Sequence, residues 1–248
     1  MNSLQTLVGL GKQTNKTTYA TAFWGTRGLS LTAVPRITEI TNENHMMGVS
    51  TRSSAQQSVP VRAGFASPLE ATLAVYPNSL GAVLLGLGFT AQTSGDGPYT
   101  HVFTKAAASS APYMTGLVRM GDGSDLLTRQ LQALRLSEAR FDFTRQAMSV
   151  AVRGLALDEK EGTGSETVTA EVDQMFAPFT GGLAFGTLAN IGNPLGHQVT
   201  ISRPIEEDDF ALHSYPLNDN QETSFAVSGV MQGVPFTGSI VAYTIGGF

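Results

Sequence analysis

Histidine is the side chain most often used to bind transition metals, and this chain contains four. No two of them lie within five residues of each other, so no local metal-binding motif is present. We therefore predict that the chain has no metal site. The four residues are His45, His101, His197 and His213.

Two acidic segments resemble parts of cation or acid–base sites. Residues 121–125 (GDGSD) match the start of a calcium loop, but the closing glutamate is missing because residue 133 is alanine. Glu206–Asp209 (EEDD) could act in acid–base chemistry, hold a weakly bound cation or form an acidic patch. Four adjacent acids at the end of a strand are typical of a solvated turn, and we expect a turn at both segments.

Signatures of phosphate binding and nucleophilic catalysis are incomplete or missing. Residues 9–14 (GLGKQT) resemble a phosphate-binding loop, but its second glycine is absent and Lys12 is followed by Gln13. The chain has no G-x-S-x-G motif and no cysteine, although a serine triad assembled from distant positions stays possible. We predict a protein that is not an enzyme, with no catalytic residue and no cofactor.

The composition points to a surface that other molecules cover. Charged residues make up 14% of the chain, whereas an ordinary soluble domain has about 25%. Because the cores of protein interfaces are depleted in charge, this predicts self-assembly; a threonine-rich monomer is the alternative. The formal net charge is −5 and the basic residues are scattered, so no basic face that would grip nucleic acid is expected.

The sequence shows no sign of export or membrane insertion. Residues 1–11 lack the basic region and long apolar region of a secretory signal. The longest mostly apolar stretch, Leu80–Phe89, is far shorter than the roughly 20 residues that cross a bilayer. We therefore expect no cleaved signal and no membrane contact.

Most of the chain has the two-residue period of β-strands. Leu69–Pro77 alternates clearly, and Ala133–Phe143 and Gln146–Leu157 are close enough to form a hairpin. One helix is predicted where Leu80, Val83, Leu84 and Leu87 share a face, with Ser79 or Asn78 at its start and Gly86 or Gly88 at its end. Without a βαβ alternation, we expect no parallel sheet. Further strands are expected within 18–41, 99–104, 113–120, 166–175, 183–185, 198–205, 222–230 and 236–244.

These elements predict one all-β domain with terminal extensions. Residues 1–17 are polar and read as an N-terminal arm, residues 18–241 form the domain, and residues 242–248 form a C-terminal tail. Within the domain, residues 42–64 form a long irregular loop, and loops of this length are usually functional or disordered. Segments 92–98 and 158–165 are expected to be loops as well.

The order of these elements resembles the tail tube (major tail) proteins of long-tailed bacteriophages. The most specific parts are TLAVYPNSLGAVLLGLG (residues 72–88) and YTHVFT (residues 99–104). The segment Thr18–Thr21, the hairpin Leu134–Leu157 and the late VTISRPIEEDD (residues 199–209) fit the same order. The similarity covers most of residues 18–240, and no single motif in it is diagnostic.

The resemblance implies a β-sandwich or partial barrel with one short flanking α-helix. It implies hexameric rings that stack into a tube in the virion, through which DNA passes into the host without specific binding. The subunit would be made in the host cytoplasm. Its partners would be the tape-measure protein, the tail terminator and the baseplate or tail-tip proteins.

The same resemblance implies two groups of functional residues. The arm, the long loop and the tail are candidates for contacts between rings, with His45, Met46, Met47 and Arg52 proposed from the loop. Acidic side chains that line the channel would repel the phosphates of DNA. The candidates for this role are Glu138, Asp142, Glu166 and Glu171.

Three other functions fit a β-rich chain. A head-decoration or tail-terminator protein would also self-associate, but would stop at a fixed ring or trimer. A carbohydrate-binding adhesin module should show clustered exposed aromatic residues, which the sequence does not suggest. A hydrolase on a β scaffold would need a pocket that contains acids with perturbed pKa values.

Overall fold

The computed structural model describes residues 5–33, 36–40, 61–96, 100–107, 110–121, 126–143, 148–164, 166–170, 197–205, 223–231 and 234–237. These residues form strands for the most part, together with one short helix, which confirms the predicted all-β class. The strands are β1 (Gln5–Lys12), β2 (Ala22–Ala33), β3 (Arg36–Ile40), β4 (Val61–Ala74), β5 (Phe89–Ser94), β6 (Thr100–Lys105), β7 (Met114–Gly121), β8 (Leu126–Phe143), β9 (Met148–Ala156), β10 (Asp158–Glu161), β11 (Thr167–Ala170), β12 (His197–Ser202), β13 (Ala226–Met231) and β14 (Val234–Thr237). The helix is α1 (Pro77–Gly86).

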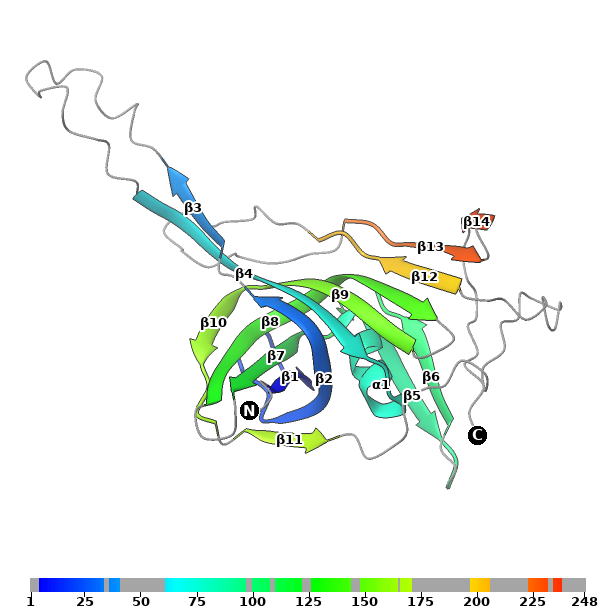
Figure 1. The fold of residues 1–248 in the computed structure, drawn as a ribbon, viewed down its shortest axis with the longest axis horizontal. Helices are drawn as coiled ribbons and strands as arrows, with labels where there is room; N and C mark the ends of the chain where they lie inside the picture. Colours follow the sequence, from blue (N-terminus) through cyan, green and yellow to red (C-terminus); the bar gives the residue numbers. More distant parts are fainter. Residues whose placement is uncertain are drawn as a thin grey trace, which may run out of the picture.

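Six strands pair in a circuit that surrounds the core (Figure 1). The circuit runs β1–β2–β4–β9–β8–β7 and returns to β1, and each of these pairs is antiparallel. From this circuit the sheet extends to β3 on one side and through β12 and β13 to β14 on the other, so β3 and β14 end its longest path among the described residues; β10 and β11 also pair with one strand each, β8 and β2. Strands β5 and β6 form a separate hairpin beside α1.

Strand β8 is longer than predicted because its two halves have different neighbours. Its first half pairs with β7 and β10, and its second half pairs with β9 and β12. The predicted hairpin of β8 and β9 is confirmed. Since β8 contacts four other strands, it joins the six-strand circuit to the outer strands.

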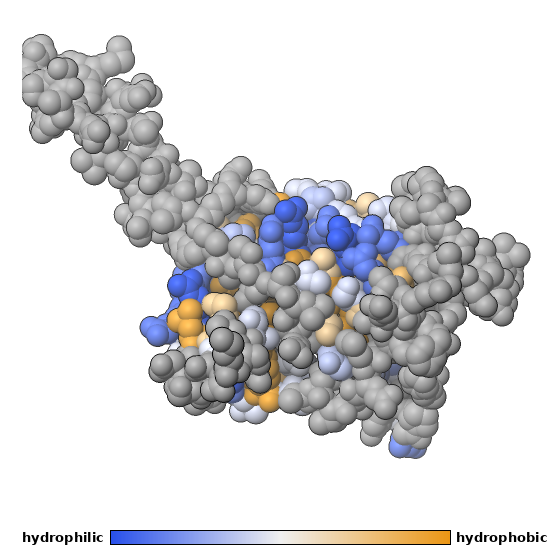
Figure 2. Space-filling model, in the orientation of Figure 1, coloured by the Kyte–Doolittle hydropathy of each residue, from blue (hydrophilic) through white to orange (hydrophobic). Residues whose placement is uncertain are grey.

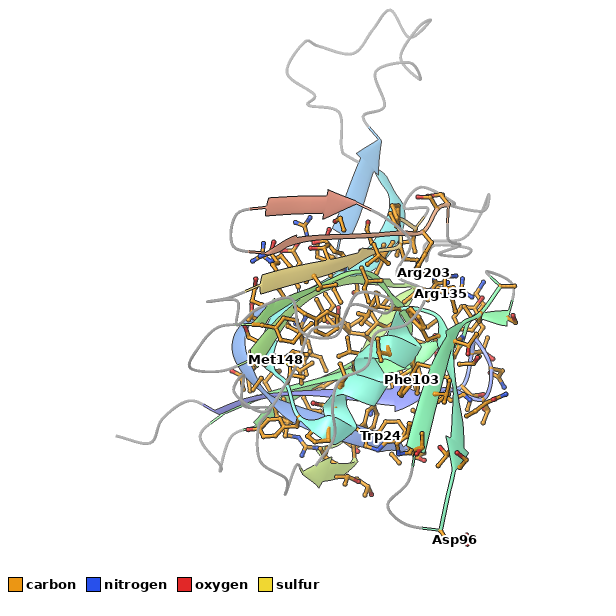
Figure 3. The ribbon with its side chains drawn as sticks, turned by 90° about the vertical axis from the view of Figure 1, so that its right-hand side faces the viewer. Trp24, Asp96, Phe103, Arg135, Met148 and Arg203 are labelled. Carbon is orange, nitrogen blue, oxygen red and sulfur yellow. The ribbon has the colours of Figure 1, made fainter. Side chains whose placement is uncertain are left out.

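The core lies inside the circuit and is closed by α1. Alternate residues of β4 and β9, including Leu69, Leu73 and Val150, are buried together with Val83 and Leu87 at the helix. Burying one such side chain contributes about 1.5–3 kcal/mol, so this alternation determines which face of each strand turns inward. Figure 3 shows α1 against these strands, with Phe103 of β6 packing toward the helix.

Helix α1 confirms the predicted helix and begins at Pro77, a residue suited to the first helical position because it has no N–H to satisfy. The N-cap is Tyr76 and not Ser79 or Asn78 as predicted; Ser79 lies in the first turn, where its hydroxyl accepts a hydrogen bond from the Tyr76 N–H at 3.1 Å. The helix ends at Gly86, and Gly88 follows with φ +84°, a conformation that favours glycine.

The prediction of an N-terminal arm is wrong for residues 5–12. They form β1, which pairs with β2 on one side and β7 on the other and buries Val8 and Leu10. The glycines between these residues hid the strand pattern in the sequence. A Cβ at Gly9 would lie 3.1 Å from the Cβ of Phe23, so glycine lets β2 and β7 side chains cover β1 closely.

Residues that follow β1 are also held against the sheet. The buried side chain of Gln13 accepts a hydrogen bond from the Ala133 N–H at 3.1 Å and donates one to the Thr18 carbonyl at 2.8 Å. Ala133 has φ +49°, an unfavourable conformation for a residue with a Cβ. Gln13 therefore supports a strained position in the middle of β8.

Replacing Gln13 with alanine is expected to destabilise the protein by about 1–3 kcal/mol, because it removes one buried and one partly buried hydrogen bond. Equilibrium unfolding in urea measures this change. The matched control is Gln132→Ala, since Gln132 donates to the Thr17 carbonyl of the same segment through an exposed hydrogen bond. Equal losses in the two variants would contradict a special role for Gln13.

Several further details of the fold differ from the expectations. The predicted loop 92–98 overlaps β5, whose side chains are exposed at most positions and so show no apolar alternation. The predicted loop 158–165 contains β10, and the end of the long loop, residues 61–64, belongs to β4. Strand β11 pairs with β2 in parallel, which gives one parallel pair but no parallel sheet. The fourteen described strands also outnumber the segments in which strands are expected.

Candidate functional site

The outward side of four neighbouring strands forms a continuous polar surface, which we call the polar face. Its residues alternate with the buried residues of β4, β9, β8 and β12, so they point away from the core. In Figure 2 hydrophilic residues gather along the upper side of the view, where these strands lie in Figure 1. The polar face comprises Glu70, Thr72, Ser149, Ala151, Arg153, Glu138, Arg140, Asp142, Gln198, Thr200 and Ser202.

The strand register places the charged residues of the polar face in adjacent rows. Arg153 of β9 lies opposite Glu70 of β4 and opposite Glu138 of β8. In the next rows along β8, Arg140 and then Asp142 occupy the same face. The partners of these two residues are uncharged: Ala151 and Thr200 for Arg140, and Ser149 and Gln198 for Asp142.

Hydrogen bonds and ion pairs connect these side chains. Arg153 Nη2 lies 2.9 Å from Glu70 Oε1, and Arg140 Nε lies 3.4 Å from Asp142 Oδ2. The second Asp142 oxygen accepts a hydrogen bond from Gln198 Nε2 at 2.5 Å. The face therefore combines three carboxylates with two guanidinium groups, and its charge nearly cancels.

The structure brings together only part of the predicted acidic set. Glu138 and Asp142 lie on the polar face, but Glu166 lies elsewhere. Glu171 is outside the described residues, as are the proposed ring contacts His45, Met46, Met47 and Arg52 in the connection from β3 to β4.

The sequence prediction missed three charged residues of the polar face. Glu70 lies in the alternating segment LEATLA, and Arg153 lies in the alternating segment SVAVRG. Arg140 lies between the two acids that were selected on β8. Alternation in their own segments turns Glu70 and Arg153 outward, and Arg140 shares the face of its two acidic neighbours, so the signal for these residues lay in β4, in β9 and in the basic residues.

Glu166 stabilises the connection between β10 and β11. Its carboxylate lies 3.2 Å from Arg119 Nη2 of β7 and accepts a hydrogen bond from Gln130 Nε2 of β8 at 2.7 Å. The Thr163 N–H donates to the same carboxylate at 2.7 Å. With only 6% of its side chain exposed, Glu166 contributes to the fold and not to an accessible acidic surface.

The surroundings of Glu166 change its pKa strongly. Burial acts to raise the pKa, but hydrogen bonds from backbone groups and from the Gln130 and Thr163 side chains outweigh it and lower the pKa from 4.5 to about 2. Because the pKa is lower in the folded state, the ionised carboxylate stabilises the protein above about pH 4.5. This stabilisation is lost as the pH falls from 4.5 toward 2.

We expect Glu166→Gln to destabilise the protein by about 1–3 kcal/mol at pH 7, because hydrogen bonds to a charged acceptor are lost. The difference from the wild type should shrink as the pH falls toward 2, where the wild-type carboxylate becomes protonated. Urea unfolding at pH 7, 4 and 2.5 measures both effects. Glu161→Gln, at an exposed position of β10, is the control; a difference for Glu166→Gln that does not change with pH would contradict this assignment.

The described residues form no cluster of metal-binding side chains. They contain no group of three or more histidine, aspartate or glutamate residues that could hold a metal ion. His101 is exposed on β6 and hydrogen-bonds to Thr93 of β5 at 2.9 Å. Glu206–Asp209 and residues 122–125 of the GDGSD segment are outside the described residues.

Within the described part of the chain, no helix has the length and apolar character required to cross a membrane.

No protein-family model matches the chain, and no curated protein matches its sequence.

Proposed function

We propose that this chain is the structural subunit of a bacteriophage tail tube, built from hexameric rings that stack around a channel for DNA. The observation that carries the proposal is the shape of the sheet. Its β3–β4 hairpin projects away from the body, and its two ends, β3 and β14, are free among the described residues (Figure 1). Combined with the low charge content, this arrangement favours assembly with further copies.

Free sheet ends support the formation of rings. An unpaired strand exposes a row of N–H and C=O groups that can pair with another chain. A contact between different ends of two copies is heterologous, and it forms a closed ring when its rotation closes. In the proposed ring, the β3 end of one copy faces the β14 end of the next.

The projecting hairpin supports stacking of the rings. Strands β3 and β4 pair from Arg36↔Ala66 to Ile40↔Val61, and the proposed contacts His45, Met46, Met47 and Arg52 belong to the connection that follows. In the assembled tail, the end rings contact the tail terminator and the baseplate or tail-tip proteins. The tape-measure protein occupies the channel before DNA does.

The polar face is the surface that we assign to the channel. Its near-neutral mixture of small polar groups and paired charges suits a surface along which DNA slides, because adhesion to DNA needs unbalanced positive charge. Glu138 and Asp142 remain the proposed channel acids, and Glu70 joins them. Glu171 is proposed as a channel acid from the sequence alone, because it lies outside the described residues.

Negative-stain electron microscopy of the concentrated protein at neutral pH tests this function. Hollow tubes or stacked rings with a central channel are expected. The matched variant replaces residues 41–60 with Asn-Gly, which can close the hairpin because Ile40 and Val61 are directly paired. This variant should keep the wild-type melting temperature and form rings that no longer stack.

Other particles would point to another function. Trimers, closed cages or compact particles without a channel would contradict the tube and favour a head-decoration protein. Single rings from the wild-type chain, at every concentration tested, would favour a tail terminator. Tubes from the Asn-Gly variant as long as those of the wild type would show that the connection is not the stacking contact.

A further inference from the structure

The five charged side chains of the polar face alternate in sign along one path. Arg153 lies between Glu70 and Glu138, which are its partners on the two neighbouring strands. Arg140 lies between Glu138 and Asp142 along β8, two residues from each and therefore on the same face. Each arginine thus has an acidic residue at the neighbouring position on both sides, and the two arginines have Glu138 as a common neighbour.

The two arginines are accessible to a large ligand. The side chains of Arg153 and Arg140 are 62% and 50% exposed. Exposed guanidinium groups bind phosphate well, because their planar N–H groups match its oxygens. Two of them on a face that DNA passes would slow the DNA unless nearby negative charge offset them.

The carboxylates are placed to provide that negative charge. Directly opposite residues in an antiparallel pair have Cβ atoms about 5 Å apart, well within the Debye length of about 8 Å at physiological ionic strength. Exposed ion pairs of this kind contribute only about 0–1 kcal/mol to stability, so fold stability does not account for the alternation. Its main effect is on the electrostatic potential that a polyanion meets.

We infer that Glu70, Glu138 and Asp142 mask Arg140 and Arg153 from the phosphates of double-stranded DNA. The inference rests on the proposed function, in which DNA passes along the polar face. Glu138 has the largest part because it lies beside both arginines. The masked face keeps polar side chains in contact with water and yet does not bind DNA.

Chromatography on a double-stranded DNA column at low salt tests the masking. The variant is the full chain with Glu70→Gln, Glu138→Gln and Asp142→Asn, which leaves both arginines on an otherwise uncharged face. Wild-type protein is expected in the flow-through. The variant is expected to be retained and to elute as the salt concentration rises, since phosphate contacts are salt-dependent.

Two controls separate local masking from overall charge. Asp96→Asn, Asp158→Asn and Glu161→Gln together change the formal net charge from −5 to −2, as the first variant does, but lie outside the polar face. This control should flow through the column. Adding Arg140→Gln and Arg153→Gln to the first variant should abolish its retention.

The outcomes distinguish this inference from the proposed function. Flow-through of the first variant, or equal retention of the charge-matched control, would overturn the masking. If the triple variant does not fold, as judged by circular dichroism, Glu138→Gln alone replaces it, because that change removes the shared carboxylate. The column experiment uses free subunits and does not depend on assembly. A failure to form tubes in the electron microscope would therefore contradict the proposed function without changing the result of the column.

Discussion

Replacing Gly88 with alanine is expected to destabilise the protein by roughly 2–5 kcal/mol, through backbone strain and a steric clash. Gly88 has φ +84°, where a residue with a Cβ is strained. A Cβ at this position would also lie 2.6 Å from Nη1 and 2.7 Å from Cζ of Arg203. The backbone N–H of Arg203 donates to the Ser137 carbonyl, which fixes the main chain, and the full burial of its side chain leaves the guanidinium group little room to move.

Gly164→Ala separates the two causes. Gly164 has φ +77°, close to the value at Gly88, but a Cβ there would have no neighbour within 4 Å. Alanine at Gly164 should therefore cost only the backbone strain, about 1–2 kcal/mol. Thermal and urea unfolding of both variants measure the difference. Equal losses would show that Arg203 moves aside and that the clash contributes nothing.

The sequence predicts an element of this fold well when the apolar positions of that element repeat within a few residues. The β8–β9 hairpin and α1 were predictable because their apolar positions repeat within a few residues, as Leu134, Leu136, Val150 and Val152 do. Alternation from the buried Leu134 and Leu136 would instead turn Glu138 and Asp142 inward, and it is the register shift between Leu136 and Glu138 that turns both acids outward. Local periodicity is sufficient where one face is buried and the other is solvated.

The sequence was insufficient where distant segments determine the structure. Glu166 lies 47 residues from Arg119 and 36 residues from Gln130, so nothing near it in the sequence indicates that its carboxylate is enclosed. Strand β1 was missed for a related reason. Its glycines are needed because Phe23 and Leu117 pack over them, and those contacts exist only after β2 and β7 have paired with β1.

Replacing Leu136 with alanine is expected to cost about 2–5 kcal/mol, because the residue is fully buried and its loss leaves a cavity in the core. Gly86, the last residue of α1, borders this cavity. A Cβ at Gly86 would lie 2.9 Å from Cδ1 and 3.0 Å from Cγ of Leu136, but 3.8 Å from its Cβ. Gly86→Ala should therefore be unfavourable alone and fit well when Leu136 is alanine.

The two substitutions together should cost less than the sum of their separate costs, by about 1–3 kcal/mol. Gly154→Ala provides the control for this coupling. A Cβ at Gly154 would lie 2.9 Å from Cδ2 of Leu136, but also 2.7 Å from the Arg135 carbonyl oxygen, which is backbone and stays in place. Leu136→Ala should therefore relieve Gly86→Ala and leave most of the cost of Gly154→Ala. Equal coupling in the two double-mutant cycles, measured by urea unfolding, would contradict the packing of α1 against Leu136.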